Sequence, residues 1–200
     1  MAGSSARRPR ESFAERRSRR AEVEDPTVVL DAALRFLEVR PRSVAEVRRR
    51  LTSAGYREDL VTNTLDRLVD LQMLDDESFA RQWVESRDRA RPRGERALQA
   101  ELRQKGIESD TIAAVLEDRR GSETDHDVGE PLPDERAARR LLDRHANALG
   151  RVTDLRVRRQ RAYALLARNG FGPDICRQAA ASWLDATGDA SVDRGVDQLD

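Results

Sequence analysis

The sequence predicts an all-α protein of three tandem three-helix units, about nine helices in all, stacked into an elongated curved solenoid. One phrase recurs at 51–56, 102–107 and 166–171: a leucine, three residues, a glycine and a large apolar residue. Leucine and alanine supply much of the apolar content, and helix-forming arginine, glutamate and glutamine dominate the rest. With 37% charged and only 4% aromatic residues, thin layers of helix suit this chain better than one thick core.

The domain boundaries follow from charge and from the repeat. The N-terminal residues are basic and nearly free of apolar side chains, which predicts a disordered arm. An acidic stretch widens the spacing between the second and third repeat glycines, which indicates a flexible insertion. We therefore expect a basic arm at 1–26, three-helix units at 27–74, 75–120 and 133–186, an acidic insertion at 121–132 and an acidic disordered tail at 187–200.

The first unit shows the pattern that the others repeat. Apolar residues at helical spacing predict a helix from Thr27, which ends before Pro41 because proline disfavours helical geometry in the preceding residue. A capping box that starts at Ser43 begins the second helix, and Gly55 ends it in the left-handed conformation. The third helix is expected over 58–71.

The second and third units keep this order. Acidic residues 75–77 start a helix that ends at a break over 91–94. The third unit starts at Pro133, with a first helix that places Leu149 inward and a second that runs from Leu155, also expected inward. A second repeat signal supports the division, because residues 76–81 match 134–139 at four of six positions. The structural repeat glycines are Gly55, Gly106 and Gly170.

No motif in the sequence is typical of a catalytic or cofactor-binding site. Phosphate-binding loops and nucleophile elbows are absent. His126 and His145 have no partner at ligand spacing, and a helix N-terminus already explains the acids at 75–77. Cys176 is the one cysteine and is expected to be a small buried residue. We therefore expect a protein without enzymatic activity, cofactor or metal.

We expect a soluble cytoplasmic protein, a monomer, that contacts no membrane, and the single cysteine suits a reducing compartment. No stretch approaches the roughly 18 apolar residues needed to cross a bilayer. The basic N-terminus also lacks the apolar segment of a secretory signal.

Function is expected on clusters of arginine. Guanidinium groups bind carboxylates and phosphates through paired hydrogen bonds, so exposed clusters suit an acidic protein groove or a nucleic-acid backbone. A single surface arginine is more often simply solvated, and Trp83 and Trp183 are more often core residues than stacking platforms. The candidate partner-binding or DNA-binding residues are Arg48, Arg49, Arg50, Arg87, Arg89, Arg93, Arg156, Arg158, Arg159 and Arg161.

Two ordered groups of motifs carry a resemblance to a known family. Residues 33–56 contain Ala-Leu-Arg-Phe-Leu, Arg-Pro-Arg-Ser-x-x-Glu and a closing Gly-Tyr. Residues 74–107 contain Leu-Asp-Asp-x-x-Phe-Ala, Ser-Arg and Leu-x-x-Lys-Gly-Ile. Together they resemble the RecX family of recombination regulators over roughly residues 27–184, most specifically at 75–107. The acidic insertion and the basic arm depart from the compact pattern of that family.

The resemblance implies a curved helical protein that binds the RecA filament along its helical groove and catalyses nothing. In that family, docking interferes with RecA's ATPase, strand-exchange and co-protease activities, which implies a mainly inhibitory regulator of recombination, DNA repair and the SOS response. The alternative is a sequence-tolerant DNA-binding protein of tri-helical modules, which contacts single-stranded DNA through its basic faces. Steeply salt-dependent binding to bare DNA would favour that alternative, and weak binding without RecA would favour the regulator. A passive helical scaffold would do neither.

Overall fold

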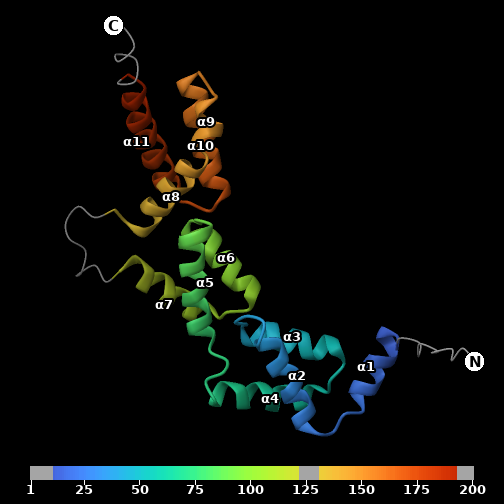
Figure 1. Ribbon diagram of the computed structural model, residues 1–200. Helices are drawn as coiled ribbons and strands as arrows, with labels where there is room; N and C mark the ends of the chain where they lie inside the picture. Colours follow the sequence, from blue (N-terminus) through green and yellow to red (C-terminus); the bar gives the residue numbers. More distant parts are fainter. Residues whose placement is uncertain (1–10, 122–130, 193–200) are drawn as a thin grey trace, which may run out of the picture. The chain divides into compact units, whose positions relative to one another are not determined.

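The computed structural model describes residues 11–121 and 131–192, with side chains as far as residue 186. All regular structure in these residues is α-helical, which confirms the predicted all-α class (Figure 1). They form eleven helices, two more than the nine predicted. The chain divides into two compact units, at 1–79 and 80–200. Much of the predicted acidic insertion, and the outer parts of the arm and the tail, lie outside the described residues.

In the first unit, three helices pack around one core. Helices α2 (Pro26–Leu37), α3 (Val44–Ala54) and α4 (Glu58–Asp70) contact one another pairwise and lie together in Figure 1. α2 begins with proline at its first position, and Asp25 caps it by accepting a hydrogen bond from the Thr27 amide at 2.8 Å. Their apolar stripes bury Val29, Ala33, Val47, Leu51, Val61, Leu65 and Leu68.

The prediction of a disordered arm is wrong for residues 13–21, which form helix α1 (Phe13–Ala21). Its start is a reciprocal capping box: the Ser12 amide donates to Glu15 at 2.7 Å, and the Glu15 amide donates to the Ser12 hydroxyl at 3.2 Å. The hydrogen bond from the Ser12 backbone also lowers the pKa of Glu15. Because α1 buries none of its residues, hydrophobic periodicity missed it, and the capping box was the available signal.

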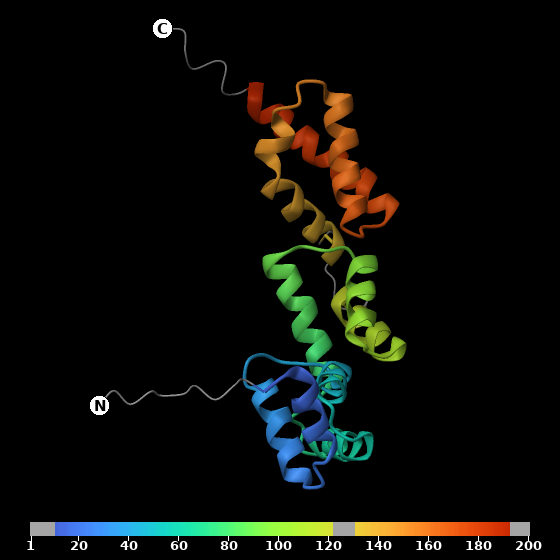
Figure 2. The same cartoon turned by 90° about the vertical axis from the view of Figure 1, so that its right-hand side faces the viewer.

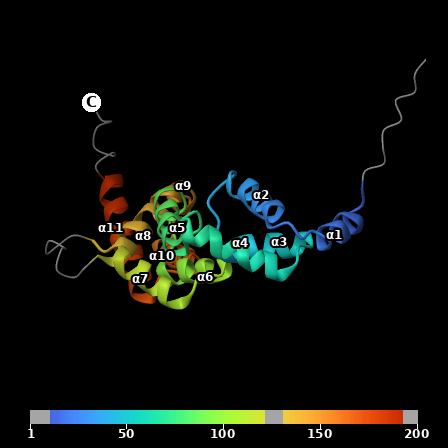
Figure 3. The ribbon, with the colours of Figure 1, turned by 90° about the horizontal axis from the view of Figure 1, so that it is seen from below.

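Helix α1 packs against the C-terminal end of α3 (Figure 3). Gly55 has a φ of +104°, and a Cβ atom there would lie 2.7 Å from the carbonyl oxygen of Arg17. The Arg20 guanidinium lies 5.6 Å from the centre of the Tyr56 ring and donates to the carbonyl oxygen of Ala54 at 3.4 Å. The first repeat glycine therefore ends α3 and also admits the backbone of α1.

The second unit holds the remaining helices, with α5 (Asp76–Ala90) beginning in the first unit and continuing into the second. The helix that ends the described residues reaches Val192, beyond residue 186, where the third three-helix unit was expected to end. The further helices are α6 (Glu95–Lys105), α7 (Ser109–Arg120), α8 (Pro133–Arg144), α9 (Ala146–Gly150), α10 (Leu155–Arg168) and α11 (Pro173–Val192).

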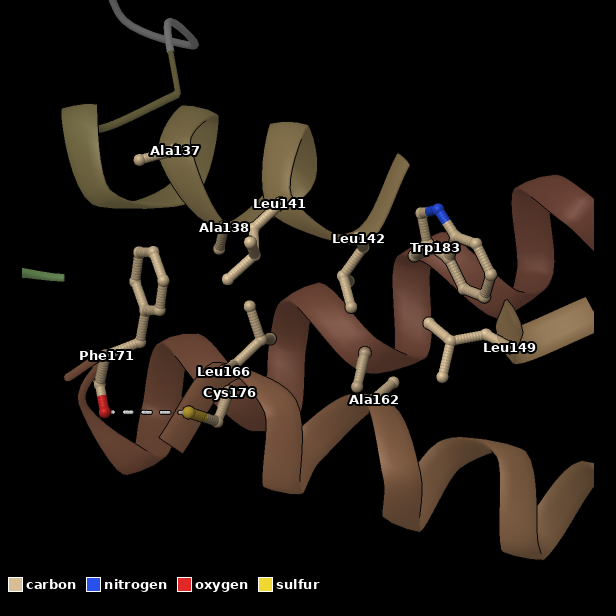
Figure 4. Packing of buried hydrophobic residues seen from close by; sticks show 11 residues of the cluster. Ala137, Ala138, Leu141, Leu142, Leu149, Ala162, Leu166, Phe171, Cys176 and Trp183 are labelled. Carbon is tan, nitrogen blue, oxygen red and sulfur yellow. Dashed lines mark hydrogen bonds between the residues drawn. The ribbon is translucent and has the colours of Figure 1, made fainter. Parts of the chain in front are cut away.

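Helices α8, α10 and α11 share a core, shown in Figure 4. Trp183 is a core residue as predicted, and its indole nitrogen donates to Asp143 at 2.9 Å. Leu155, which was expected to point inward, is instead 62% exposed. The buried cluster contains Ala138, Leu141, Leu142, Leu149, Ala162, Leu166, Phe171, Cys176 and Trp183.

The third of the predicted three-helix units, at 133–186, has a short extra helix because its first helix is interrupted at His145. The carbonyl oxygen of Leu141 lies 2.9 Å from the His145 ring nitrogen Nδ1, while the His145 amide donates to Leu142 instead. This competition of a side chain for a backbone acceptor ends α8 at Arg144. Leu149, on α9, is nevertheless buried as predicted.

Two aspartates of the second repeat signal each join one predicted three-helix unit to the three-helix unit that precedes it in the sequence. Asp75 caps its own helix, but Asp76 accepts from the amide of Val44, the first residue of α3, at 2.9 Å. Asp134 likewise accepts from the amide of Glu95, the first residue of α6, at 3.1 Å. Each aspartate thus neutralises the positive end of the second helix in the preceding unit. The sequence had explained the acids at 75–77 only by the helix that they begin.

Arg119 makes the junction at Asp134 a three-residue ion network. Its guanidinium donates to both Asp88 oxygens at 2.9 Å and to Asp134 at 2.6 Å, and its side chain is only 7% exposed. Burial by itself would lower the pKa of Arg119, but the hydrogen bonds to Asp88 and Asp134 outweigh it and raise the pKa. The network ties α5, α7 and α8 together.

Glycines bring α6 and the α10–α11 loop into backbone contact. Gly55, Gly106 and Gly170 all have positive φ, at 104°, 84° and 86°. A Cβ atom on Gly170 would lie 2.4 Å from the Cβ atom of Ala97, and one on Gly94 would lie 2.4 Å from the carbonyl oxygen of Gly170. The Gly94 amide donates to the Asn169 carbonyl oxygen at 3.0 Å. Gly170 therefore has a packing role in addition to ending α10.

Cys176 is fully buried, and burial raises the pKa of its thiol. Because the reactive thiolate is both disfavoured and covered, we expect iodoacetamide at about pH 8 to leave the native protein unlabelled. The same treatment in urea should label the thiol completely, with mass spectrometry as the readout. Rapid labelling of the native protein would contradict the buried position.

Candidate binding surfaces

The ten arginines proposed for binding separate into side chains that hold the fold together and side chains that are available to a partner. Arg87 and Arg93 belong to the first group. The Arg87 Nε atom donates to Glu101 at 2.6 Å, and its guanidinium lies 4.2 Å from the centre of the Trp83 ring. Arg93 pairs with the same carboxylate at 3.5 Å and donates to the Asn169 side chain.

Trp83 is the centre of this internal cluster. Its indole nitrogen donates to Glu101 at 2.9 Å, and the Lys105 ammonium lies 4.7 Å from its ring centre. The ring is half-buried, so Trp83 is a packing residue at the surface edge of α5 and α6. Arg87 and Lys105 already occupy positions over it, which argues against a stacking platform for an external base.

The three arginines at 48–50 on α3 differ in their side-chain contacts. Arg48 pairs with Glu58 at 2.8 Å and also donates to Thr62 at 3.2 Å. Arg50 lies 5.7 Å from the centre of the Phe36 ring. Arg49 is exposed, and no side-chain partner for it lies within the described residues. Arg49 is thus the most available of the three.

The sequence missed Arg42, which shares the Phe36 ring with Arg50. Its guanidinium lies 4.1 Å from the ring centre, closer than that of Arg50. Its Nε atom is buried without a hydrogen-bond partner among the described residues. Burial, followed by the charge of Arg40, lowers the pKa of Arg42. The Arg-Pro-Arg-Ser run at 40–43 was the sequence signal that could have identified Arg42.

Arg89 is exposed on α5 and pairs with Glu85, one helical turn earlier, at 3.3 Å. Such an exposed pair contributes about 0.3–0.5 kcal/mol and is easily exchanged for another partner. Arg89 also supplies a backbone carbonyl oxygen that accepts from Arg144 at 3.1 Å. Its side chain is therefore available, although its backbone is part of the fold.

On α10, the structure divides the predicted cluster further. The Arg158 Nε atom donates to the carbonyl oxygen of Val152 at 2.8 Å, so this half-buried side chain anchors the start of the helix. Arg156, Arg159 and Arg161 are exposed, and none has a side-chain partner within the described residues. With Arg158 removed from the set, these three form the largest group of available predicted arginines.

Arg156 and Arg159 line a groove of about 780 Å³ between α10 and α11. Arg161 does not line it. These two helices pack side by side in Figures 1 and 2 and are joined by a short loop. Sequence reasoning missed the groove because its other wall comes from α11. The lining residues are Arg156, Arg159, Gln160, Tyr163, Arg177, Gln178, Ala180 and Ala181.

No metal site or membrane span is visible in the part of the chain that the structure describes. No three His, Cys, Asp or Glu side chains gather there in a way that could hold a metal ion. None of the described helices is both long enough and apolar enough to cross a bilayer. His126 lies outside the described residues.

The chain matches two family models, described as the first and second three-helix domains of RecX, over residues 30–68 and 75–116. Regulatory protein RecX of Mycobacterium sp. (strain KMS) is 43% identical over 143 residues, which cover 71% of this chain and 74% of the relative. For Regulatory protein RecX of Mycobacterium tuberculosis the identity is 36% over 153 residues, covering 76% and 84%.

Solved structures show the same fold. The structure of RecX from Lactobacillus salivarius superposes with a TM-score of 0.66 at 21% identity, covering 80% of this chain and 97% of that one. A second structure, of a regulatory protein RecX, gives a TM-score of 0.60 at 20% identity, covering 82% and 70%. At these identities the likeness concerns the fold alone.

Proposed function

The chain belongs to the RecX family, and from that membership we propose that it binds the RecA nucleoprotein filament and modulates the filament's activities. The modulation is mainly inhibitory and acts on ATP hydrolysis, strand exchange and co-protease activity. The observation that carries this proposal is the 43% identity to a RecX regulatory protein over 71% of the chain. A family of regulatory proteins also agrees with a chain that lacks catalytic motifs.

The exposed arginines support a contact with a negatively charged partner. Arg156, Arg159 and Arg161 project from one helix without an internal partner in the described residues, so their charges are not neutralised within the fold. Guanidinium groups pair with carboxylates of a protein surface and with phosphates of bound DNA, and a nucleoprotein filament presents both. Several units on one chain allow contacts with more than one protomer of a repetitive polymer.

Reversal of Arg156, Arg159 and Arg161 to glutamate should raise the concentration for half-inhibition of RecA's ATPase on single-stranded DNA by at least about tenfold. Like charges would then face the partner across the contact. Arg158 stays unchanged because its hydrogen bond to Val152 anchors α10. The measurement is a titration of RecA's ATPase with each protein, and circular dichroism verifies that helicity is retained.

A matched control reverses Arg139, Arg140 and Arg151, which are also exposed and change the net charge equally. This control should keep inhibition within about twofold of the unaltered protein, since it spares the proposed contact face. Unchanged inhibition by the α10 variant would remove that face from the contact. A lack of any effect of the unaltered protein on RecA would overturn the proposed function itself.

A further inference from the structure

The α10–α11 groove, defined by the eight lining residues given above, is lined by charged residues of positive sign alone. Three of its lining residues are arginines and none is acidic. Arg177 pairs with Asp174 outside the groove, but both side chains are largely exposed, at 65% and 89%, so the pair is weak and exchangeable. An anionic ligand would therefore meet three guanidinium groups with little competition.

The remaining lining residues match the chemistry of a nucleobase. Tyr163, one helical turn from Arg159, is partly buried against the core and also lines the groove, and Gln160 and Gln178 each offer an amide donor and an acceptor. Bases stack on aromatic rings and present both donors and acceptors at their edges. We infer that the α10–α11 groove binds a single strand of nucleic acid, with phosphates at the arginines and a base against Tyr163.

An acidic protein segment fits the same groove less well. Its carboxylates would satisfy the arginines, and its backbone amides could donate to the glutamine carbonyl oxygens. It would nevertheless leave the Tyr163 ring without a flat partner. Ala180 and Ala181 on α11 keep that side of the groove free of bulky side chains, which admits the face of a ring.

Both walls of the groove are anchored in the core of the second unit. On α10, Ala162 and Leu166 are buried next to the lining residues, and on α11 Cys176 and Ala180 are buried in the same way. The lining side chains are therefore presented by two fixed helices. A site built on fixed helices loses little entropy on binding, which favours measurable affinity for a flexible strand.

This inference rests on the proposed function, since the strand available to the groove would be the DNA held by the filament. It is tested on the full chain alone, without RecA, by fluorescence anisotropy with a labelled oligothymidylate of about 20 nucleotides. Substitution of Arg156, Arg159 and Arg177 by glutamine should weaken binding at least about tenfold and make the log-log salt slope shallower by about 2. The control changes Arg140, Arg151 and Arg168, which are exposed and lie outside the lining, to glutamine, and should keep most of the affinity and slope.

The aromatic contact is tested separately at Tyr163. Tyr163→Leu should weaken binding about tenfold, whereas Tyr163→Phe should bind as the unaltered protein does, because phenylalanine keeps the ring face. Equal binding by the leucine and phenylalanine variants would remove the stacked base from the site. Circular dichroism on both variants checks that the helices are intact.

The remaining outcomes decide between ligand classes. Displacement of the oligonucleotide by a polyglutamate peptide of equal charge, at equal concentration, would overturn the nucleic-acid assignment in favour of an acidic protein partner. An equal loss of DNA binding in the groove variant and its control would show that total charge, and not the groove, is responsible. If the unaltered protein inhibits RecA yet groove variants bind the strand normally, the inference fails and the proposed function stands.

Discussion

Replacement of Arg119 by methionine should lower the free energy of unfolding of the second unit by about 3 kcal/mol. The variant leaves Asp88 and Asp134 without their shared cation, and their side chains are only 24% and 17% exposed. It also releases the aspartate that caps α6 at Glu95. Both tryptophans of the chain, Trp83 and Trp183, belong to the second unit, so tryptophan fluorescence during urea unfolding reports on that unit.

The neighbouring residue supplies the matched control. Arg120 pairs with Glu95 and Glu117 but is 49% exposed, so Arg120→Met should change stability by less than about 0.5 kcal/mol. Because the pKa of Arg119 is raised, its charge contributes fully below the ordinary arginine pKa and is lost only above it. The difference between the two variants should therefore persist from about pH 6 to about pH 9. Equal stability of the variants would contradict the structural role of the network.

Replacement of Gly94 by alanine should also destabilise the second unit, by about 2–3 kcal/mol. Gly94 has an ordinary extended backbone, with φ −75° and ψ 160°, so alanine adds no backbone strain there. The added Cβ atom would instead lie 2.4 Å from the Gly170 carbonyl oxygen and from the Phe171 amide nitrogen. Because the obstructing atoms are backbone, α6 and the α10–α11 loop must separate.

Gly172→Ala is the control, because no heavy atom beyond its neighbours lies within 4 Å of a Cβ atom there. It should leave the urea midpoint unchanged or slightly raised. Hydrogen exchange should further show that the amide at position 94 loses its protection in the alanine variant. In the unaltered protein this amide donates a hydrogen bond to the Asn169 carbonyl oxygen. A Gly94→Ala protein as stable as the Gly172→Ala protein would refute the close approach.

Local signals in the sequence predicted most helices because each acts within a few residues. The Ser43 cap, the left-handed glycines and the apolar stripes need no distant partner, and they appear where the repeat placed them. The sequence analysis missed the break at His145 and helix α1 for different reasons. At His145 a side chain competes for a backbone carbonyl, and α1 lacks the buried stripe that periodicity detects.

The candidate site was predicted less well, because an arginine's availability depends on residues far away in sequence. Arg87 is taken up by Glu101 from the next helix, whereas Arg156 meets no such partner in the described residues. Nothing in the local sequence distinguishes the two. The opposite wall of the groove, which includes Arg177, comes from α11. The sequence of α11 contains no arginine cluster that would have predicted a binding surface there.

Local sequence patterns were enough to predict the helical class, the repeat of three-helix units and the positions of most helix ends. These depend on backbone preferences and on side chains within one or two turns. The folded chain was needed to show that Asp76 and Asp134 cap helices of the preceding three-helix units, that Gly94 and Gly170 permit backbone contact, and that two arginines of α10 face a groove. Those roles are set by distances between segments that are remote in the chain, which no local pattern encodes.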